Sequence, residues 1–297
     1  MDATPIPYNE NNLDTTPPDK FPIVIRPASG WIPLNVGEIW RYRELLYFLV
    51  WRDVKVRYKQ TALGALWAVL QPFLAMLVFT FFFGSLANVG SDGFPYPLFS
   101  YVALLPWILF AQAIGQSAES LVKSSNLVQK VYFPRAIVPA ASVVSGVVDF
   151  ALAFLALGAL MAYYGVRPGL AVLWLPVLVL FCLSAALGAG MWLSALNVEY
   201  RDVRYALPFC LQLWMFATPV IYPGSGVIAW LERHDLPAWL YGLNPMVGVV
   251  EGFRWALLGG SVPVGPLIAS GSVVSGLLLL TGAYYFRRME RTFADAV

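Results

Sequence analysis

Six long apolar runs follow one another along the chain, and polar segments separate them. Each run has about 18 residues or more, enough at about 1.5 Å per residue to cross a hydrocarbon core of about 30 Å. The pattern therefore predicts an all-α integral membrane fold with six transmembrane helices. The predicted spans are Ala62–Leu86, Leu98–Leu121, Ala136–Tyr164, Leu170–Leu196, Tyr205–Tyr222 and Val262–Phe286.

Two shorter apolar pieces, around Val227–Leu231 and Val247–Leu258, lie between the fifth and sixth predicted spans. They are too short to cross a membrane, and they are interrupted by Pro223, Gly226, Pro237 and Pro245. Irregular backbone at membrane depth is tolerated only where protein or a water-filled cavity surrounds it. The pattern favours re-entrant periplasmic gate helices, and an ordinary external loop with two surface helices is the alternative. The candidate gate residues are Pro223, Asn244, Pro245, Glu251 and Arg254.

The segment before the first span, residues 38–60, mixes aromatic, aliphatic and charged residues without proline or glycine. At 100° per residue, four basic residues share one face and three aliphatic residues share the opposite face, which predicts an amphipathic interface helix. Asp53 and Arg57 are spaced as an i,i+4 pair. The two faces carry Arg41, Arg52, Lys55 and Lys59 on one side, and Leu46, Val50 and Val54 on the other.

The chain thus divides into three segments: a tail of residues 1–37, the interface helix, and a transmembrane domain over residues 61–290. The tail contains seven prolines among Asp, Asn and Thr residues, so we expect it to be disordered and cytoplasmic. In the fourth run, Ser184–Gly188 and Ala186–Gly190 have the small-xxx-small spacing that lets membrane helices approach closely.

Composition and charge agree with a membrane protein and orient it. Hydrophobic residues make up 59% of the chain and charged residues 12%. Of the 19 lysines and arginines, only Arg167, Arg233 and Arg254 fall on one side of the predicted spans, which leaves 16 on the side of the N-terminus. The positive-inside rule then places both termini in the cytoplasm. We expect the protein to lie in the cytoplasmic (inner) membrane.

Charged and metal-binding side chains are scarce in the spans. Asp149 is the clear charge in the middle of a span, and the pattern offers it no Lys, Arg or His partner, which favours an interhelical hydrogen bond over a proton relay. The two cysteines, Cys182 and Cys210, lie in apolar runs and His234 stands alone, so no metal site is predicted. An ion-coupled carrier would need paired charges, and a membrane enzyme would need clustered acids or histidines.

No phosphate-binding loop occurs in the chain, since no lysine follows a glycine. If ATP drives transport, another polypeptide must bind it. The connection Lys123–Arg135 is too short to be a catalytic domain, but its helical middle suits docking into such a partner.

Four ordered motifs resemble the membrane subunit of ABC-2 type exporters, with O-antigen and related polysaccharide exporters as the closest branch. The resemblance covers roughly residues 38–290. The motifs are WRDVKVRYKQTALGALWAVLQPFLAMLVF, KSSNLVQKVYFPR, NVEYRDVRYALPFCLQLWMFATPVIYP and LNPMVGVVEGFRWALLG.

The resemblance implies a permease that pairs with a second copy of itself and with two ABC ATPase subunits, which hold ATP and Mg, so that this chain binds no cofactor. Its cargo would be a lipid-linked, O-antigen-like polysaccharide; teichoic acid and capsule exporters share much of the pattern. Membrane lipids surround it, and nothing calls for nucleic acid. The implied ATPase-coupling residues are Arg52, Lys55, Lys59, Ser125, Asn126, Leu127, Val128 and Lys130.

A substrate pathway between the first and fifth spans of both copies is also implied. Sugar chains offer hydroxyls and apolar C–H faces, which aromatic rings can stack against and hydrogen-bond. For each aromatic candidate, lipid contact or helix packing is an equally open role. The candidates are Trp67, Phe79, Phe82, Phe83, Phe209, Trp214, Phe216 and Tyr222.

Overall fold

The computed structural model describes residues 36–59, 64–260, 262–290 and 293 of the 297-residue chain. The chain divides into the units Met1–Ile32 and Pro33–Val297, and the described residues all belong to the second. The predicted disordered tail lies outside them up to residue 35. Within the described ranges, every regular element is a helix.

Five predicted spans are confirmed as helices long and apolar enough to cross a membrane. The first begins as α3 (Leu66–Phe79) and continues as the π-helical turn η2 (Thr80–Leu86), and the fourth begins as the 3₁₀ turn η3 (Leu170–Trp174) and continues as α7 (Leu175–Glu199). The others are α4 (Tyr96–Lys123), α6 (Ile137–Tyr163) and α11 (Val264–Met289).

The predicted fifth span, Tyr205–Tyr222, is not one continuous helix. Helix α8 (Val203–Ala217) has 15 residues and ends at Thr218, whose φ of −106° and ψ of 141° are extended. Pro219 follows, and the residue before a proline is disfavoured in the helical region because the proline ring crowds it. The chain continues as a turn through residues 218–223.

The segment before the first span forms two helices, α1 (Val36–Arg41) and α2 (Arg43–Lys59), rather than one. Leu49 is buried, and Leu46 and Val50 pack beside it, so the apolar face exists. The opposite surface is not purely basic, and the predicted separation of faces is not confirmed. The exposed residues of these two helices include Trp40, Arg41, Arg43, Glu44, Tyr47, Phe48, Trp51, Lys55, Val56 and Lys59.

The predicted Asp53–Arg57 pair is wrong, because Asp53 is bonded to its neighbour Arg52 at 2.9 Å and Arg57 pairs with Asp149 on α6. Helix α2 packs against α6.

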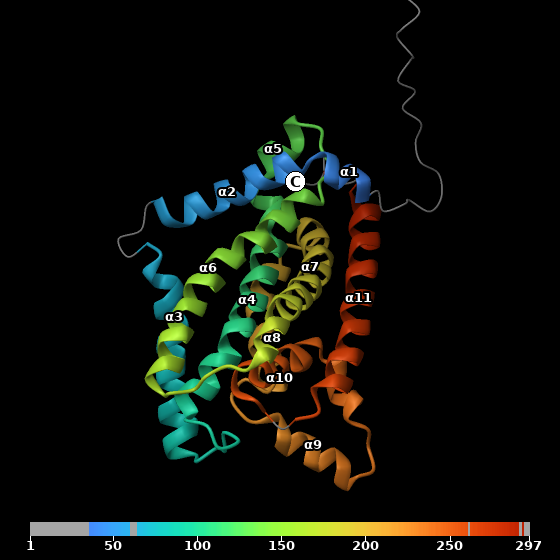
Figure 1. Ribbon diagram of the computed structural model, residues 1–297. Helices are drawn as coiled ribbons and strands as arrows, with labels where there is room; N and C mark the ends of the chain where they lie inside the picture. Colours follow the sequence, from blue (N-terminus) through green and yellow to red (C-terminus); the bar gives the residue numbers. More distant parts are fainter. Residues whose placement is uncertain (1–35, 60–63, 261, 291–292, 294–297) are drawn as a thin grey trace, which may run out of the picture. The chain divides into compact units, whose positions relative to one another are not determined.

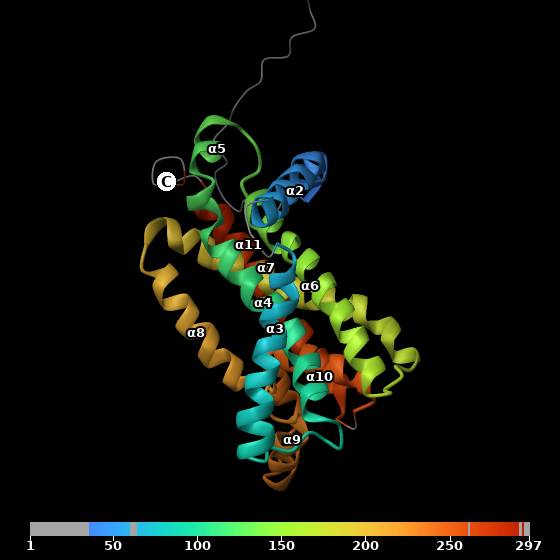
Figure 2. The same cartoon turned by 90° about the vertical axis from the view of Figure 1, so that its left-hand side faces the viewer.

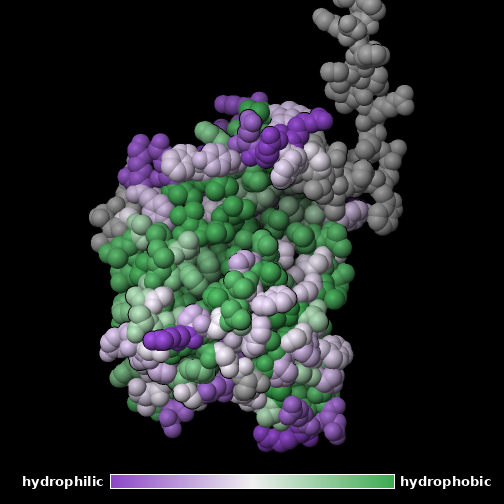
Figure 3. Space-filling view, viewed as in Figure 1, coloured by the Kyte–Doolittle hydropathy of each residue, from purple (hydrophilic) through white to green (hydrophobic). Residues whose placement is uncertain are grey.

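Helix α4 is the most buried of the five candidate spans and packs against α3, α6, α7, α8 and α10. Figure 1 shows α2 and α5 (Ser125–Lys130) at one end of the helical bundle and α9 (Gly224–Arg233) at the other. Figure 2 shows α8 at one side of α4 and α7. In Figure 3 an apolar band lies between polar surfaces at the two ends, as expected for a membrane protein.

The small residues of α7 make the predicted close contacts. A Cβ atom at Gly188 would lie 2.5 Å from the carbonyl carbon of Leu278 on α11, and one at Gly190 would lie 2.4 Å from the Ser117 hydroxyl on α4. Both distances are shorter than van der Waals contact. Glycine at these positions therefore lets α7 pack directly on α11 and α4.

Candidate functional site

Three short helices follow α8, and a proline lies at the start of each or directly before it. Pro223 precedes α9, Pro237 precedes the 3₁₀ helix η4 (Ala238–Leu243), and Pro245 is the first residue of α10 (Pro245–Leu258). Proline suits a helix start, where its missing N–H would have no partner in the helix. The predicted break at Gly226 is wrong, since this glycine lies inside α9.

Helix α10 is enclosed by protein. Apart from Trp255, all of its residues are buried, and it packs against α4, α7 and α11. An ordinary surface helix would keep one face in solvent. The alternative of a surface loop therefore does not describe α10, whereas α9 keeps Trp230 half exposed.

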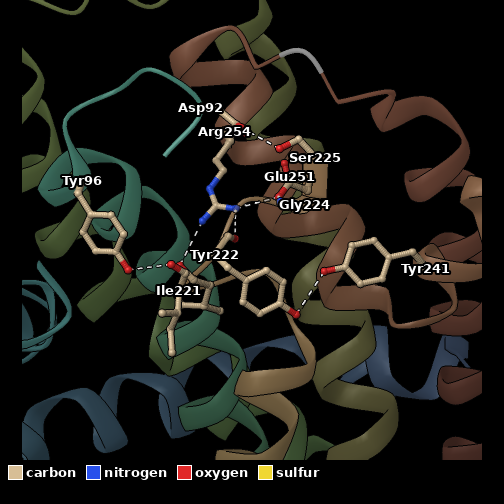
Figure 4. Close-up of polar contacts among 10 residues, drawn as sticks. Asp92, Tyr96, Ile221, Tyr222, Gly224, Ser225, Tyr241, Glu251 and Arg254 are labelled. Atoms are coloured by element: carbon tan, nitrogen blue, oxygen red, sulfur yellow. Dashed lines mark hydrogen bonds and ion pairs between the residues drawn. The ribbon is translucent and has the colours of Figure 1, made fainter. Parts of the chain in front are cut away.

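A buried ion pair lies at the centre of this region. Arg254 Nη1 donates a hydrogen bond to Glu251 Oε1 at 2.8 Å, and the two residues are 3% and 2% exposed. The i,i+3 spacing seen in the sequence brings them together on α10. The backbone N–H of Gly224 also donates to Glu251 Oε1, at 3.1 Å, so the carboxylate links the start of α9 to α10 (Figure 4).

The Arg254 guanidinium also binds the turn that follows α8. It donates to the carbonyl of Val220 at 3.1 Å and to that of Tyr222 at 3.3 Å, and it lies 3.6 Å from the centre of the Phe99 ring on α4. Tyr96 donates to the intervening carbonyl of Ile221 at 2.7 Å. Because buried backbone carbonyls need donors, these contacts make the irregular turn tolerable inside the protein.

Burial penalises both charges of the pair, which lies outside the five candidate spans. Desolvation raises the pKa of the Glu251 carboxyl, and the nearby Arg254 guanidinium opposes this shift. Two such groups are stable in a dry environment only as a well-bonded unit. The pair is therefore suited to holding α9, α10 and the turn in one arrangement.

Asn244 joins α8 to α10. Its Oδ1 accepts hydrogen bonds from the backbone N–H of Met246 at 3.1 Å and from the Trp214 indole at 2.9 Å, while its Nδ2 donates to the Thr218 hydroxyl at 3.0 Å. Asn244 is thus both the N-cap of α10 and a clamp on the end of α8. Trp214 additionally packs edge-on against Phe110 at 5.0 Å, so this aromatic candidate is held within the chain.

The other aromatic candidates fall into two groups. Phe79 and Phe83 pack edge to face at 5.8 Å against the protein core, and the Tyr222 hydroxyl donates to the carbonyl of Phe216 at 3.1 Å. The second group is exposed on α3, η2 and α8 and so can meet lipid, cargo or another chain. It consists of Trp67, Phe82, Phe209 and Phe216.

The candidate coupling residues lie at the opposite end of the bundle, on α2 and α5. Val128 is buried with Leu49, Leu121 and Phe133, so its side chain is not at the surface. Helix α5 packs against α4, and Leu127 is partly buried in the same cluster, to which Leu49 of α2 also belongs. Arg52 and Ser125 are partly exposed, and the exposed candidates are Lys55, Lys59, Asn126 and Lys130.

A polar cluster between α2 and α6 was missed by the sequence reasoning. Arg57 and Tyr58 both donate hydrogen bonds to the Asp149 carboxylate, and Arg57 also donates to Gln116 Oε1 at 2.6 Å. The prediction that Asp149 lacks a cationic partner is therefore wrong. One signal was present: Arg57 follows Leu46 and Val50 by 11 and 7 residues, which puts a cation on the apolar face of α2.

Comparison with known proteins matches residues 44–258 to the family model described as ABC-2 type transporter. The O-antigen export system permease protein RfbA of Myxococcus xanthus is 33% identical over 262 residues, which cover 88% of this chain and 98% of that protein. An O-antigen export system permease protein RfbA of Klebsiella pneumoniae is 25% identical over 88% of this chain and 96% of its own length. The polysialic acid transport protein KpsM of Escherichia coli is 22% identical over 80% of this chain and 91% of its own length.

Proposed function

Because this chain belongs to the ABC-2 type transporter family, we propose that it is the membrane permease of an ATP-driven exporter of a lipid-linked, O-antigen-like polysaccharide. The observation that carries this proposal is the similarity to O-antigen permeases along nearly their whole length. A permease of a capsular polysaccharide is the second candidate, supported by the polysialic acid transport protein, which matches a smaller share of this chain.

Deleting the chain from its host tests this function. A lipid-linked glycan should accumulate on the cytoplasmic side while the corresponding surface glycan disappears, because synthesis would continue without export. Extraction of lipid-linked sugars and surface labelling measure the two pools, and resupplying the chain is the control. Normal surface glycan in the deletion strain would contradict the proposal.

We propose that both termini are cytoplasmic and that α8, together with the turn after it, forms the fifth of six crossings, in addition to the five candidate spans. The two ends of the described bundle support this orientation, because the basic helix α2 lies at one end and the few outer cations, such as Arg233, lie at the other. In this orientation α9 and α10 form the outer end of the permease.

Cysteine labelling measures the orientation. In a Cys210→Ala background, Asn126→Cys and Glu232→Cys should react with an impermeant maleimide from opposite sides of the membrane. Cys182 can stay, since it is fully buried, whereas Asn126 and Glu232 are exposed. Labelling of both positions from one side would refute the orientation.

In this proposal, α9, η4 and α10 form an outer gate, and the Glu251–Arg254 pair holds it closed. The pair connects α10 to the start of α9 and to the turn after α8, so movement of any one of these must change contacts of the others. The exposed rings of Trp67, Phe82, Phe209 and Phe216 would form the pathway with those of a second copy. Aromatic faces suit sugar chains because they bind C–H surfaces weakly and repeatedly.

ATP and Mg would be held by two separate ABC ATPase subunits, which dock on α2 and α5. The exposed charges at this end and the burial of Val128 and Leu49 in one cluster support such a surface. A force applied to α5 would pass to α2 through the buried cluster that contains Val128 and Leu49, and from α2 to α6 through Arg57 and Asp149.

Reversing one charge on α5 tests this surface. Lys130→Glu should weaken capture of the ATPase subunit about tenfold and lower export, because charged groups at an interface steer and orient partners. Co-purification of the two subunits measures the effect. The control is Arg233→Glu, the same kind of reversal at an exposed arginine of the outer end. Equal capture by the parent and Lys130→Glu would exclude Lys130 from the surface.

A further inference from the structure

A cavity of about 320 Å³ lies between the end of α2 and helices α3, α4 and α6, apart from the gate. Its size is at the lower end of small-molecule sites, about 300–1,000 Å³. Polar side chains gather in it, although a membrane protein normally keeps such groups out of its lipid-level surfaces. They are Arg57, Tyr58, Gln71, Gln112, Gln116 and Asp149.

The cavity changes from polar to apolar along the membrane normal. On α4, Gln116 and Gln112 lie toward the α2 end, and Leu109 and Leu105 follow toward the middle of the helix. On α6, Asp149 likewise precedes Ala153 on the way inward. A phospholipid has the same order, with its headgroup at the interface and its chains toward the bilayer centre. The apolar half would not contribute to the binding of a small polar ligand.

The polar end carries balanced charge. Arg57 and Asp149 form an ion pair whose side chains remain 25% and 14% exposed, so each still faces the cavity. The amides of Gln71 and Gln112 are joined by one hydrogen bond of 3.2 Å, which leaves each amide further hydrogen-bonding capacity. One cation next to one anion complements a headgroup that also has one charge of each sign.

We propose that this cavity binds the headgroup and the upper part of the acyl chains of one zwitterionic phospholipid of the phosphatidylethanolamine type, from the leaflet at the α2 end, while the rest of the chains stays in the bilayer. Its phosphate would be bound by Arg57 and its ammonium by Asp149, while Gln71 and Gln112 bind the ester and phosphate oxygens. A diphosphate lipid carrier fits poorly, because the Asp149 carboxylate would repel its second charge. Trp67, one of the proposed pathway residues, also lines this cavity, but the lipid proposed here is not the cargo and does not depend on which polysaccharide is exported.

Native mass spectrometry of the full-length chain tests the proposal. The delipidated protein is offered equal amounts of phosphatidylethanolamine and phosphatidylglycerol with identical acyl chains. We expect the zwitterionic lipid to be bound about tenfold more often, since hydrogen bonds to charged groups are worth at least that factor. Glycerophosphoethanolamine, which lacks acyl chains, should not displace it, because the apolar half would stay empty.

Two variants separate this site from general lipid adhesion. Gln71→Leu with Gln112→Leu should lower occupancy of the zwitterionic lipid about tenfold, and Gln212→Leu, an exposed amide on α8, is the matched control with unchanged occupancy. Asp149→Asn leaves a net positive site and should shift the preference toward phosphatidylglycerol. Misfolding alone would not reverse a preference, and the glutamine variants test the site independently of the ion pair.

Three results would overturn the proposal. The first is equal or better binding of phosphatidylglycerol by the parent protein. The second is displacement by the headgroup without acyl chains, and the third is parental occupancy in the double glutamine variant.

Discussion

Arg254→Ala is expected to destabilise the permease by about 3–5 kcal/mol and to abolish or severely impair export. The substitution leaves the Glu251 carboxylate buried without its cation, which is the costly way to break a buried pair. It also removes the donor to the carbonyls of Val220 and Tyr222 in the turn after α8. Apparent unfolding temperature in detergent measures the first effect, and an export assay with a small-solute leak control measures the second.

The double variant Glu251→Ala with Arg254→Ala should recover part of the loss, because no unpaired charge remains. Full recovery is not expected, since the Gly224 N–H and the two carbonyls still lack partners. Arg233→Ala, at an exposed arginine of α9, is the matched control and should stay close to the parent. If Arg254→Ala behaved like Arg233→Ala, the pair would have no part in gating or stability.

Arg57→Leu should be the second large effect, with a loss of about 3 kcal/mol, because it leaves Asp149 unpaired at membrane depth. Export should fall with it, since this pair joins α2 to α6. Arg57→Leu combined with Asp149→Leu should restore most of the stability, because replacing both partners by apolar side chains is often neutral. Unfolding temperature and purified yield measure both variants.

Arg52→Leu is the matched control for this experiment. Arg52 pairs with the adjacent Asp53, but the two side chains are 38% and 22% exposed, and exposed pairs contribute about 0–1 kcal/mol. A loss for Arg57→Leu no larger than that for Arg52→Leu would show that the contact between α2 and α6 depends on apolar packing alone.

Length and apolarity were sufficient to predict the ends of α4, α6 and α11 within about three residues. The reason is that long apolar segments in a membrane can form few structures other than helices. The end of α8 was missed although its cause is local. Thr218 precedes a proline, and an apolar count ignores the resulting steric restriction. Periodicity alone also placed Arg57 in an intrahelical pair, whereas its partner belongs to a helix that begins about 80 residues later.

The gate region shows the same division between local and tertiary information. The starts of α9, η4 and α10 could be predicted from Pro223, Pro237 and Pro245, and the pairing of Glu251 with Arg254 follows from their spacing on one helix. The contacts of Arg254 with carbonyls 32 and 34 residues earlier could not be predicted from the sequence, since they depend on how the turn after α8 packs on α10.

The early end of α8 also concerns the bilayer itself. Fifteen helical residues measure about 22 Å, against a hydrocarbon core of about 30 Å. The remaining depth beside α8 is occupied by a turn whose Thr218, Val220 and Ile221 are buried in protein. If α8 crosses the membrane as proposed, lipids along it meet a helix shorter than the hydrocarbon core, and such hydrophobic mismatch is relieved by local thinning at a cost of fractions of a kcal/mol per Å. Membrane thickness would then influence export, because longer acyl chains raise the free-energy cost of the thinned bilayer beside α8.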